Sequence, residues 1–373
     1  MLKLTFMHDM RIRKIREELE KKYIDALLVS NFYSILYLTG FKTLTTDERE
    51  AFVIVAKEKV YLFSDARYID EQLTLNTQYS TFEYKLIEPN KSLISHLYDI
   101  VEEEKINSLG FEAEDLKYSE YQKLSRTFKK LNPVSTDRLT IKIRELKDKQ
   151  ETDCIARACE IGDRCLTEIV KIIRPGVSEK EIGFKIEMWI REKGCDLAFD
   201  PIVAIDANAS VVHYNTKDGD GVVKDGSIVL IDFGVKYKNY LSDMTRMVFV
   251  GQPNDEVKKT YEILAEAQQK TVEKITELET LKEADEFCRK LITDNRLPSY
   301  PHSTGHGVGL EIHEYPKVSL NSPDKRKVNQ VFTIEPGVYF PDKHGMRVED
   351  TVVIKEDGKA RILTKFPKSL LAI

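Results

Sequence analysis

Residues 228–251 read IVLIDFGVKYKNYLSDMTRMVFVG. Two apolar runs rich in β-branched residues flank the polar turn KYKNY, which is the pattern of a β-hairpin. Such a hairpin brings Asp232 and Asp243 to one place on neighbouring strands, although eleven positions separate them in the chain. An aspartate on a hairpin is commonly a surface residue, and this alternative applies to Asp243. Asp232 lies inside the apolar run, where an unpaired carboxylate is expensive to bury.

A second hairpin pattern occupies residues 331–354, where VFTIEPGVYF and MRVEDTVVI flank the turn PDKHG. Glu335 is followed at once by a Pro-Gly turn, which ends its strand and leaves the carboxylate at the end of a sheet. Arg347 and Glu349 stand two positions apart, so they share one face of their strand. A surface Arg–Glu pair is the alternative interpretation of these two residues.

Four carboxylates brought together in this way need a cation. Like charges about 4 Å apart repel by roughly 4 kcal/mol per pair at an effective dielectric constant of ~20, and burial adds a desolvation penalty. A pair of divalent ions removes the repulsion. The two hairpins therefore predict a two-metal site made by Asp232, Asp243, Glu335 and Glu349.

A histidine cluster lies between the two hairpins. Residues 301–314 read PHSTGHGVGLEIHE and hold His302, His306 and His313, three of the seven histidines of the chain. The interspersed glycines let the backbone approach a ligand closely. A lone histidine is more often a structural hydrogen-bonding group, but the clustering favours a functional site. His213, in VVHYNT, follows a predicted strand and is a candidate contact for substrate or an oxyanion, with a structural role as the alternative.

The ligand chemistry indicates the metal and the reaction. Oxygen-rich coordination with one imidazole suits Mn²⁺ best, while Co²⁺, Fe²⁺ or Zn²⁺ fit the same donors. Two such ions would activate water and polarise a carbonyl, so amide hydrolysis is the expected reaction class.

Composition limits the other possibilities. A chain of 373 residues with 42% hydrophobic content is expected to form two domains. Its net charge of −5 comes from 57 basic and 62 acidic residues, a mixed surface that argues against nucleic acid and anionic membrane as partners. Five cysteines without a C-x-x-C pair fit buried thiols in a reducing compartment. The first residues form a charged helical pattern rather than a signal peptide or membrane anchor, so we expect a cytoplasmic protein.

The remaining pattern predicts an α/β (α+β) protein. Helical and strand-like segments alternate over residues 8–135, and LNPVSTDR at 131–138 is the best candidate linker. One long helix is expected from Leu139 to the break at Pro175-Gly176. From residue 150 onward, counting this helix, helices followed by a hairpin occur twice. We therefore predict domains at 1–136 and 137–373.

Five segments carry a family resemblance: IDFG, SDMTR, HSTGHGVGL-x-x-HE, TIEPGVY and RVEDTVVI. Together, in this order and spacing, they resemble the pita-bread metallopeptidases. Over essentially the whole chain the sequence is similar to the Xaa-Pro branch, aminopeptidase P and prolidase. NFYSILYLTGF and SDARY also resemble segments of this branch. The resemblance implies a creatinase-like N-terminal α/β domain and a C-terminal pita-bread domain, whose pseudo-twofold antiparallel sheet is covered by helices.

The resemblance also implies roles for the site residues. Asp232, Asp243, His306, Glu335 and Glu349 would bind two ions, with Asp243 and Glu349 touching both, and Glu335 would assist deprotonation of the nucleophile. His213 and His313 would bind the substrate and the tetrahedral intermediate, His302 would line the pocket, and Arg347 would support the ligands. The substrates would be short peptides with proline at the second position, and a homodimer is expected.

Other functions remain open at this point. Methionine aminopeptidase resembles only the C-terminal part, although an aminopeptidase of other N-terminal specificity stays possible. Creatinase shares both domains, but its reaction does not use the metals. A catalytically inactive pita-bread module for binding or chaperoning is a further alternative, against which the intact ligand set argues. The short chain slightly favours a dipeptidase over aminopeptidase P.

Overall fold

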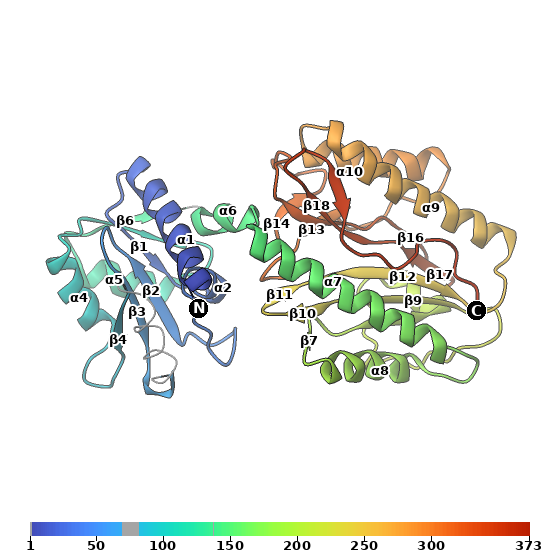
Figure 1. Ribbon diagram of the computed structural model, residues 1–373, viewed down its shortest axis with the longest axis horizontal. Helices are drawn as coiled ribbons and strands as arrows, with labels where there is room; N and C mark the ends of the chain where they lie inside the picture. Colours follow the sequence, from blue (N-terminus) through green and yellow to red (C-terminus); the bar gives the residue numbers. More distant parts are fainter. Residues whose placement is uncertain (1, 69–81, 137) are drawn as a thin grey trace. The chain divides into compact units, whose positions relative to one another are not determined.

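The computed structural model describes residues 2–68, 82–136 and 138–373. The chain divides into two compact units, Met1–Arg144 and Glu145–Ile373, each with its own sheets and hydrophobic core (Figure 1). The domain division between residues 136 and 137 stays a prediction, and residue 137 itself lies outside the described residues. Within the described ranges, no helix is both long and apolar enough to cross a bilayer.

The first unit is a mixed sheet with helices. Its elements are α1 (Leu2–Lys21), β1 (Ala26–Val29), α2 (Phe32–Thr39), β2 (Ala51–Val55), β3 (Val60–Ser64), η1 (Ala66–Tyr68), β4 (Phe82–Leu86), α4 (Leu93–Glu103), β5 (Ser108–Phe111), α5 (Tyr118–Thr127) and β6 (Asn132–Ser135). The strand order is β4-β3-β2-β1-β5-β6. Strands β1, β5 and β6 are parallel, whereas β2 runs antiparallel to both neighbours. Every residue of β1, β2 and β3 is buried, which explains their unbroken apolar sequences. The predicted α/β architecture is confirmed.

The predicted linker at 131–138 is wrong for half of its length. Residues Asn132–Ser135 form β6, which pairs in parallel with β5 at the edge of the sheet. Pro133 had suggested a linker because proline cannot donate to a strand ladder. An edge strand tolerates it, since one side of the strand has no partner.

The predicted long helix from Leu139 is in fact two helices. Helix α6 (Leu139–Glu145) ends before α7 (Lys149–Ile169) begins, and Asp148 separates them. The Asp148 carboxylate accepts a hydrogen bond from the amide of Glu151, and the amide of Asp148 donates one to the Glu151 carboxylate. This capping box starts a new helix. The expected stop is confirmed, because α7 and the short turn η2 (Val170–Ile172) end before Pro175.

The second unit contains two successive sets of helices and strands. The first set is α7, η2, α8 (Glu179–Glu192), β7 (Asp196–Leu197), β8 (Ile202–Ile205), η3 (Asp206–Ser210), β9 (Ile228–Phe233), β10 (Val235–Tyr237), β11 (Tyr240–Leu241) and β12 (Met244–Phe249). The second is α9 (Asp255–Lys274), η4 (Ile275–Glu277), α10 (Leu281–Asp294), β13 (Gly305–Gly307), β14 (Glu314–Val318), β15 (Val331–Ile334), β16 (Gly337–Phe340), β17 (His344–Arg347), β18 (Asp350–Ile354) and β19 (Ala360–Ile362).

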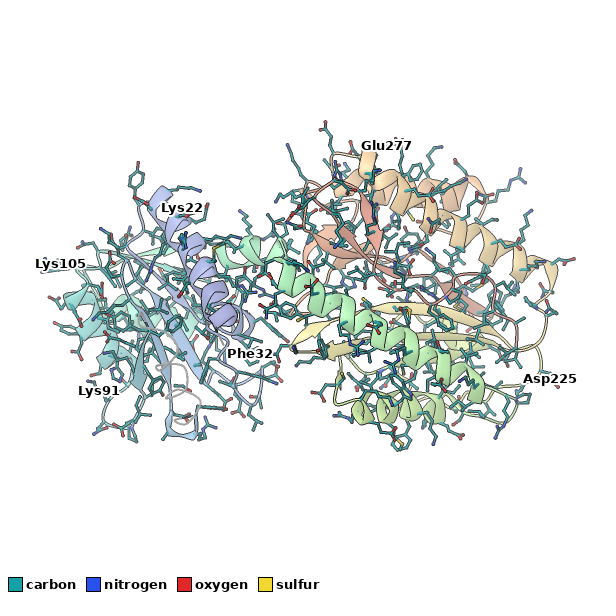
Figure 2. The ribbon with its side chains drawn as sticks, in the orientation of Figure 1. Lys22, Phe32, Lys91, Lys105, Asp225 and Glu277 are labelled. Carbon is teal, nitrogen blue, oxygen red and sulfur yellow. The ribbon has the colours of Figure 1, made fainter. Side chains whose placement is uncertain are left out.

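Helices cover the strands of this unit from both sides. Apolar residues of α7 and α8 pack on β8, β9 and β12, while α9 and α10 pack on β15 and β18. In Figure 1, α9 and α10 lie on the opposite side of the strands from α8. Side chains fill the layers between these elements, and the exposed residues Asp225 and Glu277 lie at the margin (Figure 2).

Both predicted hairpins are present. Strand β9 pairs antiparallel with β12, placing Asp232 opposite Thr245, and β10 pairs with β11 across a turn in which Lys238 and Asn239 have φ values of 48° and 70°. Positive φ at both central residues is the signature of a tight hairpin turn. In the second hairpin, β15 pairs with β18 and β16 with β17.

Candidate metal centre

The predicted ligands occupy equivalent places in the two hairpins. Asp232 is in β9, and Asp243 immediately precedes β12. Glu335 directly follows β15, and Glu349 lies between β17 and β18. Each hairpin therefore supplies two carboxylates, one from each of its two strand segments.

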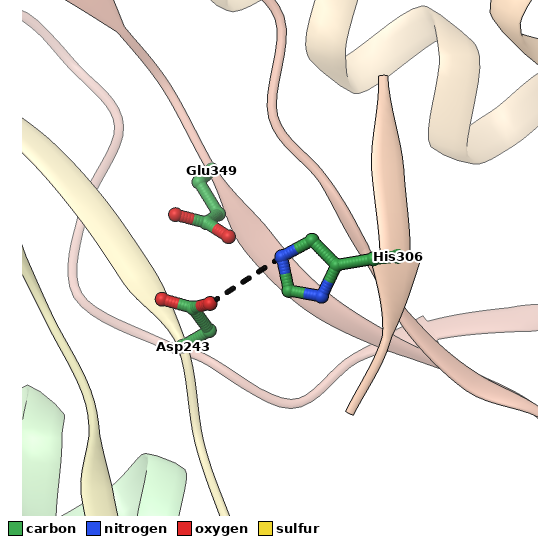
Figure 3. A group of neighbouring side chains, drawn as sticks. All are labelled: Asp243, His306 and Glu349. Atoms are coloured by element: carbon green, nitrogen blue, oxygen red, sulfur yellow. Dashed lines mark ion pairs between the residues drawn. The ribbon is translucent and has the colours of Figure 1, made fainter. Parts of the chain in front are cut away.

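His306 joins the carboxylates from strand β13. Its Nε2 atom lies 3.6 Å from Asp243 Oδ2 and 3.2 Å from Glu335 Oε1. Asp243, His306 and Glu349 each offer a ligand atom, and these three atoms lie within 4.8 Å of one another (Figure 3). Asp243 is only 5% exposed, which excludes the surface interpretation of this residue. These side chains can surround a small cation.

Among the residues that the structure describes, three buried carboxylate oxygens have no hydrogen-bond partner: Asp232 Oδ1, Asp243 Oδ1 and Glu349 Oε1. The second oxygens of two of these groups are satisfied, because Asp232 Oδ2 accepts from Arg347 and Glu349 Oε2 accepts from Thr245. A buried anionic oxygen without a donor is strongly unfavourable. Divalent cations would satisfy all three, so the residues present fit the metal ions that the sequence predicts.

The pKa shifts of these carboxylates agree with the binding of cations at this site. Burial, followed by the charges of Glu349 and Asp232, raises the pKa of Asp243 well above its usual value. Burial and the charges of Glu335 and Asp232 do the same to the pKa of Glu349. For Glu335, burial is outweighed by the hydrogen bond and charge of His306, which lower its pKa to about 2. In the absence of ions the cluster cannot hold all its negative charges at low energy.

Thr245 and Arg347 connect the two hairpins behind the ligands. The Thr245 hydroxyl donates to Glu349 Oε2 at 2.7 Å and accepts from Arg347 Nε at 3.0 Å. A second nitrogen of Arg347 lies 2.5 Å from Asp232 Oδ2, and the third donates to the Tyr339 hydroxyl at 2.9 Å. Arg347 is 3% and Glu349 1% exposed, so the alternative of a surface pair is wrong.

The structure brings two of the predicted histidines to this cluster. The ring of His313 lies 4.4 Å from that of His306 and nearly perpendicular to it. His302 Nε2 is 3.0 Å from the Tyr339 hydroxyl, so His302 is connected to Arg347 through Tyr339. Burial, then the charge of His306, lowers the pKa of His313 to about 4, which leaves its imidazole neutral at pH 7.

His213 lies in the segment after η3 and is exposed. Its charge is among those that act on His313, which places it within electrostatic reach of the cluster. The five cysteines are free and buried, as expected from the sequence.

Sequence reasoning missed Thr245, Thr333 and Tyr339. The Thr333 hydroxyl accepts from the His306 amide and donates to Glu335 Oε1, both at 3.1 Å. Strand alternation gave a signal for Thr245, which shares the face of Asp243 in its strand, and for Thr333, two residues before Glu335. Tyr339 gave no such signal, because its contacts depend on how β16 packs.

Comparisons with known proteins place the chain in a family. Residues 153–356 match the model of metallopeptidase family M24, and residues 11–146 match the creatinase/prolidase N-terminal domain. An uncharacterized peptidase of Bacillus subtilis is 34% identical over 366 residues, covering 98% of this chain and 100% of the relative. An Xaa-Pro dipeptidase of Pyrococcus horikoshii is 32% identical over 373 residues, covering 97% of this chain and 98% of the relative.

Solved structures are similar over the same length. An Xaa-Pro dipeptidase from Bacillus anthracis has a TM-score of 0.87 and 31% identity, covering 98% of this chain and 100% of the other. An X-Pro aminopeptidase from Thermotoga maritima has a TM-score of 0.84 and 31% identity, covering 97% and 99%. The second unit thus has the predicted pita-bread fold. The family match over most of this unit, together with the relatives matched over nearly the whole length, shows that the chain belongs to metallopeptidase family M24 and carries a creatinase/prolidase N-terminal domain.

Proposed function

We propose that this protein is a two-metal exopeptidase that hydrolyses Xaa-Pro bonds, in dipeptides or at the N-termini of short peptides. The observation that carries the proposal is the set of three partnerless buried carboxylate oxygens on Asp232, Asp243 and Glu349, close to the imidazole of His306. The names of the relatives, Xaa-Pro dipeptidase and X-Pro aminopeptidase, support the choice of substrate.

Five residues hold the ions in this proposal: Asp232, Asp243, His306, Glu335 and Glu349. Asp243 and Glu349 lie on opposite hairpins, and each keeps an oxygen without a partner that could bind an ion. When bound, the ions supply Lewis acidity that activates water and polarises the scissile carbonyl. Manganese is the proposed ion, since oxygen ligands predominate.

Side chains of the protein transfer the proton of the attacking water and orient the substrate. Glu335 would accept the proton of the attacking water and return it to the nitrogen of the leaving proline as the C–N bond breaks. The ring N–H of His313 donates a hydrogen bond to the substrate carbonyl, and His213 provides a second contact from its loop. His302 lines the substrate site. Arg347 does not touch substrate but fixes one oxygen of Asp232, which leaves the other directed to an ion.

A substrate panel tests the proposal. Chelator-stripped protein is assayed with an Xaa-Pro dipeptide, a longer Xaa-Pro-led peptide and a Met-Ala-led peptide, before and after addition of Mn²⁺. We expect Mn²⁺ to restore cleavage of the dipeptide. Cleavage of the longer Xaa-Pro peptide as well would assign an aminopeptidase P. Cleavage of the Met-Ala peptide alone would replace Xaa-Pro specificity by another aminopeptidase specificity, and no restored cleavage would favour a binding module.

The proposal extends to a cytoplasmic homodimer. Light scattering coupled to size-exclusion chromatography tests the assembly, because a dimer of this 43.1 kDa chain has twice the mass of the monomer. A monomeric mass at micromolar concentration would contradict this part of the proposal without affecting the assignment of the metal ligands.

A further inference from the structure

The loop that carries His213 is held by a single buried carboxylate. Residues 206–221 follow β8 and begin with η3, and Glu179 lies beneath them as the first residue of α8, with no exposed surface. Glu179 Oε1 accepts from the amide of Ile205 at 2.6 Å and from Asn208 Nδ2 at 3.0 Å. Glu179 Oε2 accepts from the Tyr214 hydroxyl at 2.9 Å and from the Gly221 amide at 3.0 Å. One side chain thus joins the start, the middle and the end of the loop.

The loop backbone fits closely around this carboxylate. A side chain at Gly219 or Gly221 would overlap the carboxylate of Glu179 and displace it. At the start of the loop, Asp206 has a φ of 53°, a left-handed conformation that is strained for a residue other than glycine. The amide of Ile228 and the hydroxyl of Ser227 donate to its carboxylate at 2.8 and 2.9 Å and hold it there. The loop therefore has a defined conformation.

Two anchored residues follow His213 in the chain. Tyr214, the next residue, is bound to Glu179, and its hydroxyl also accepts from Asn208 Nδ2 at 2.8 Å. Thr216 accepts from the amide of Val203 at 2.7 Å through its hydroxyl. These contacts fix the backbone on the C-terminal side of His213, although the His213 side chain itself is exposed.

We infer that Glu179 is a positioning residue for the peptidase reaction, which acts through Tyr214 by holding His213 towards the metal centre. This inference rests on the substrate contact given to His213 in the proposed function. Glu179 has no contact with the predicted metal ligands among its hydrogen bonds, all of which go to the loop or to the end of β8. If Glu179 only stabilised the fold, the effect of its substitution on kcat would not depend on the presence of His213.

A double-mutant cycle distinguishes the two roles. Glu179→Gln keeps the size of the side chain but places an amide group against the donors of the loop. On Mn²⁺-loaded enzyme we expect it to lower kcat by about tenfold, with a smaller change in KM, because His213 loses its place. In the His213→Ala background the same change should lower kcat by less than about twofold. Calorimetric titration should show unchanged Mn²⁺ binding in Glu179→Gln.

Glu145→Gln is the matched control. Glu145 is also a buried glutamate, 4% exposed, and it binds Lys327 and Gln330 in a turn that carries no site residue. Its substitution should lower the unfolding temperature but leave kcat within about twofold of wild type. Tyr214→Phe is a milder second variant for use if Glu179→Gln does not fold. It removes one hydroxyl, should lower kcat by about threefold, and should also lose its effect in the His213→Ala background.

Hydrogen exchange gives a readout independent of activity. Glu179→Gln and Tyr214→Phe should both speed amide exchange within residues 206–221 more than elsewhere in the second unit. Unchanged exchange in this loop would overturn the inference. If Glu179→Gln lowered kcat by the same factor in the His213→Ala background as in the wild type, the inference would be overturned. The proposed function would be unaffected. Wild-type kcat in His213→Ala would remove the role of His213 and the inference with it.

Discussion

The neighbouring carboxylates of Glu349 and Asp350 are both buried but differ in their hydrogen-bond and ion-pair partners. Glu349 is 1% exposed and Asp350 is fully buried. Asp350 has four partners: Arg246 at 2.7 Å, Lys368 at 2.6 Å, Thr364 at 2.7 Å and Gln268 at 3.1 Å. Glu349 faces the other side of the strand, where the Thr245 hydroxyl satisfies one oxygen and the other has no partner.

The pKa shifts of the two groups differ in the same way. Burial opposes ionisation of both, but the charges of Arg246 and Lys368 hold the pKa of Asp350 below its usual value. Burial and the nearby charges of Glu335 and Asp232 raise the pKa of Glu349 well above its usual value. On one side of the strand, the basic side chains of Arg246 and Lys368 neutralise the buried carboxylate. On the other side, the negative charges of the cluster are not balanced in this way; this is the unbalanced side. The unbalanced side is the one that the proposed metal ions would occupy.

The largest effect is expected from removing a charge on the unbalanced side. Asp243→Asn should lower kcat/KM for an Xaa-Pro dipeptide by at least about a thousandfold, because the ions lose a shared ligand. The metal-free variant should unfold at or above the wild-type temperature, since one repulsive charge is gone. Activity assays with Mn²⁺ and thermal unfolding followed by circular dichroism measure both. Asp357→Asn, on an exposed turn, serves as the control, and wild-type turnover in Asp243→Asn would refute the ligand assignment.

The next test compares the two carboxylates directly. In metal-free protein, Asp350→Asn should lower the free energy of unfolding by about 3 kcal/mol, because it leaves Arg246 buried without its counter-charge. Glu349→Gln should change it by less than about 1 kcal/mol or raise it, because the lost charge was repelled by its neighbours. Urea unfolding of the second unit measures both values. Equal losses would mean that the two sides of the strand do not differ.

A smaller effect is expected from the residue that links Asp232 to Thr245. Arg347→Ala should reduce kcat/KM by about ten- to a hundredfold, because Asp232 loses the group that fixes one of its oxygens but remains a ligand. Arg347→Lys should recover only part of this loss, since lysine cannot bind Asp232, Thr245 and Tyr339 at once. Steady-state kinetics at saturating Mn²⁺ decide the question, and full activity in Arg347→Ala would exclude a role at the centre.

The smallest effect concerns the hydroxyl between Arg347 and His302. Tyr339→Phe removes one hydrogen bond to each and keeps the aromatic ring, so we expect a loss of kcat/KM of about threefold. The double variant Arg347→Ala with Tyr339→Phe should be no worse than Arg347→Ala alone if the hydroxyl acts through Arg347. Fully multiplicative losses would assign Tyr339 a separate role.

Much of this site could be predicted because its signals are local. The turn KYKNY and the two-residue alternation around it predict the first hairpin, and the unusual placement of Asp232 in an apolar run indicates a cation. The partners that neutralise the Asp350 carboxylate could not be predicted. Arg246, Gln268 and Lys368 come from separate segments that only the folded chain brings together. Glu179 was missed for the same reason.

The errors in the fold have local causes as well. Pro133 made residues 132–135 resemble a linker, although the edge position of β6 allows a proline. The capping aspartate Asp148 was not recognised inside a continuous helical pattern, so α6 and α7 were predicted as one helix. Neither error affects the site, because its ligands lie on the hairpins and on β13.

Anomalous X-ray diffraction from crystals grown with Mn²⁺ would locate the bound ions. We expect two anomalous peaks, both within ligand distance of Asp243 and Glu349, and no peak beside Asp350. A Glu349→Gln crystal under the same conditions should lose at least one of them. Absence of peaks between the two hairpins, or peaks only elsewhere in the molecule, would contradict the claim that the partnerless carboxylate oxygens form the metal site.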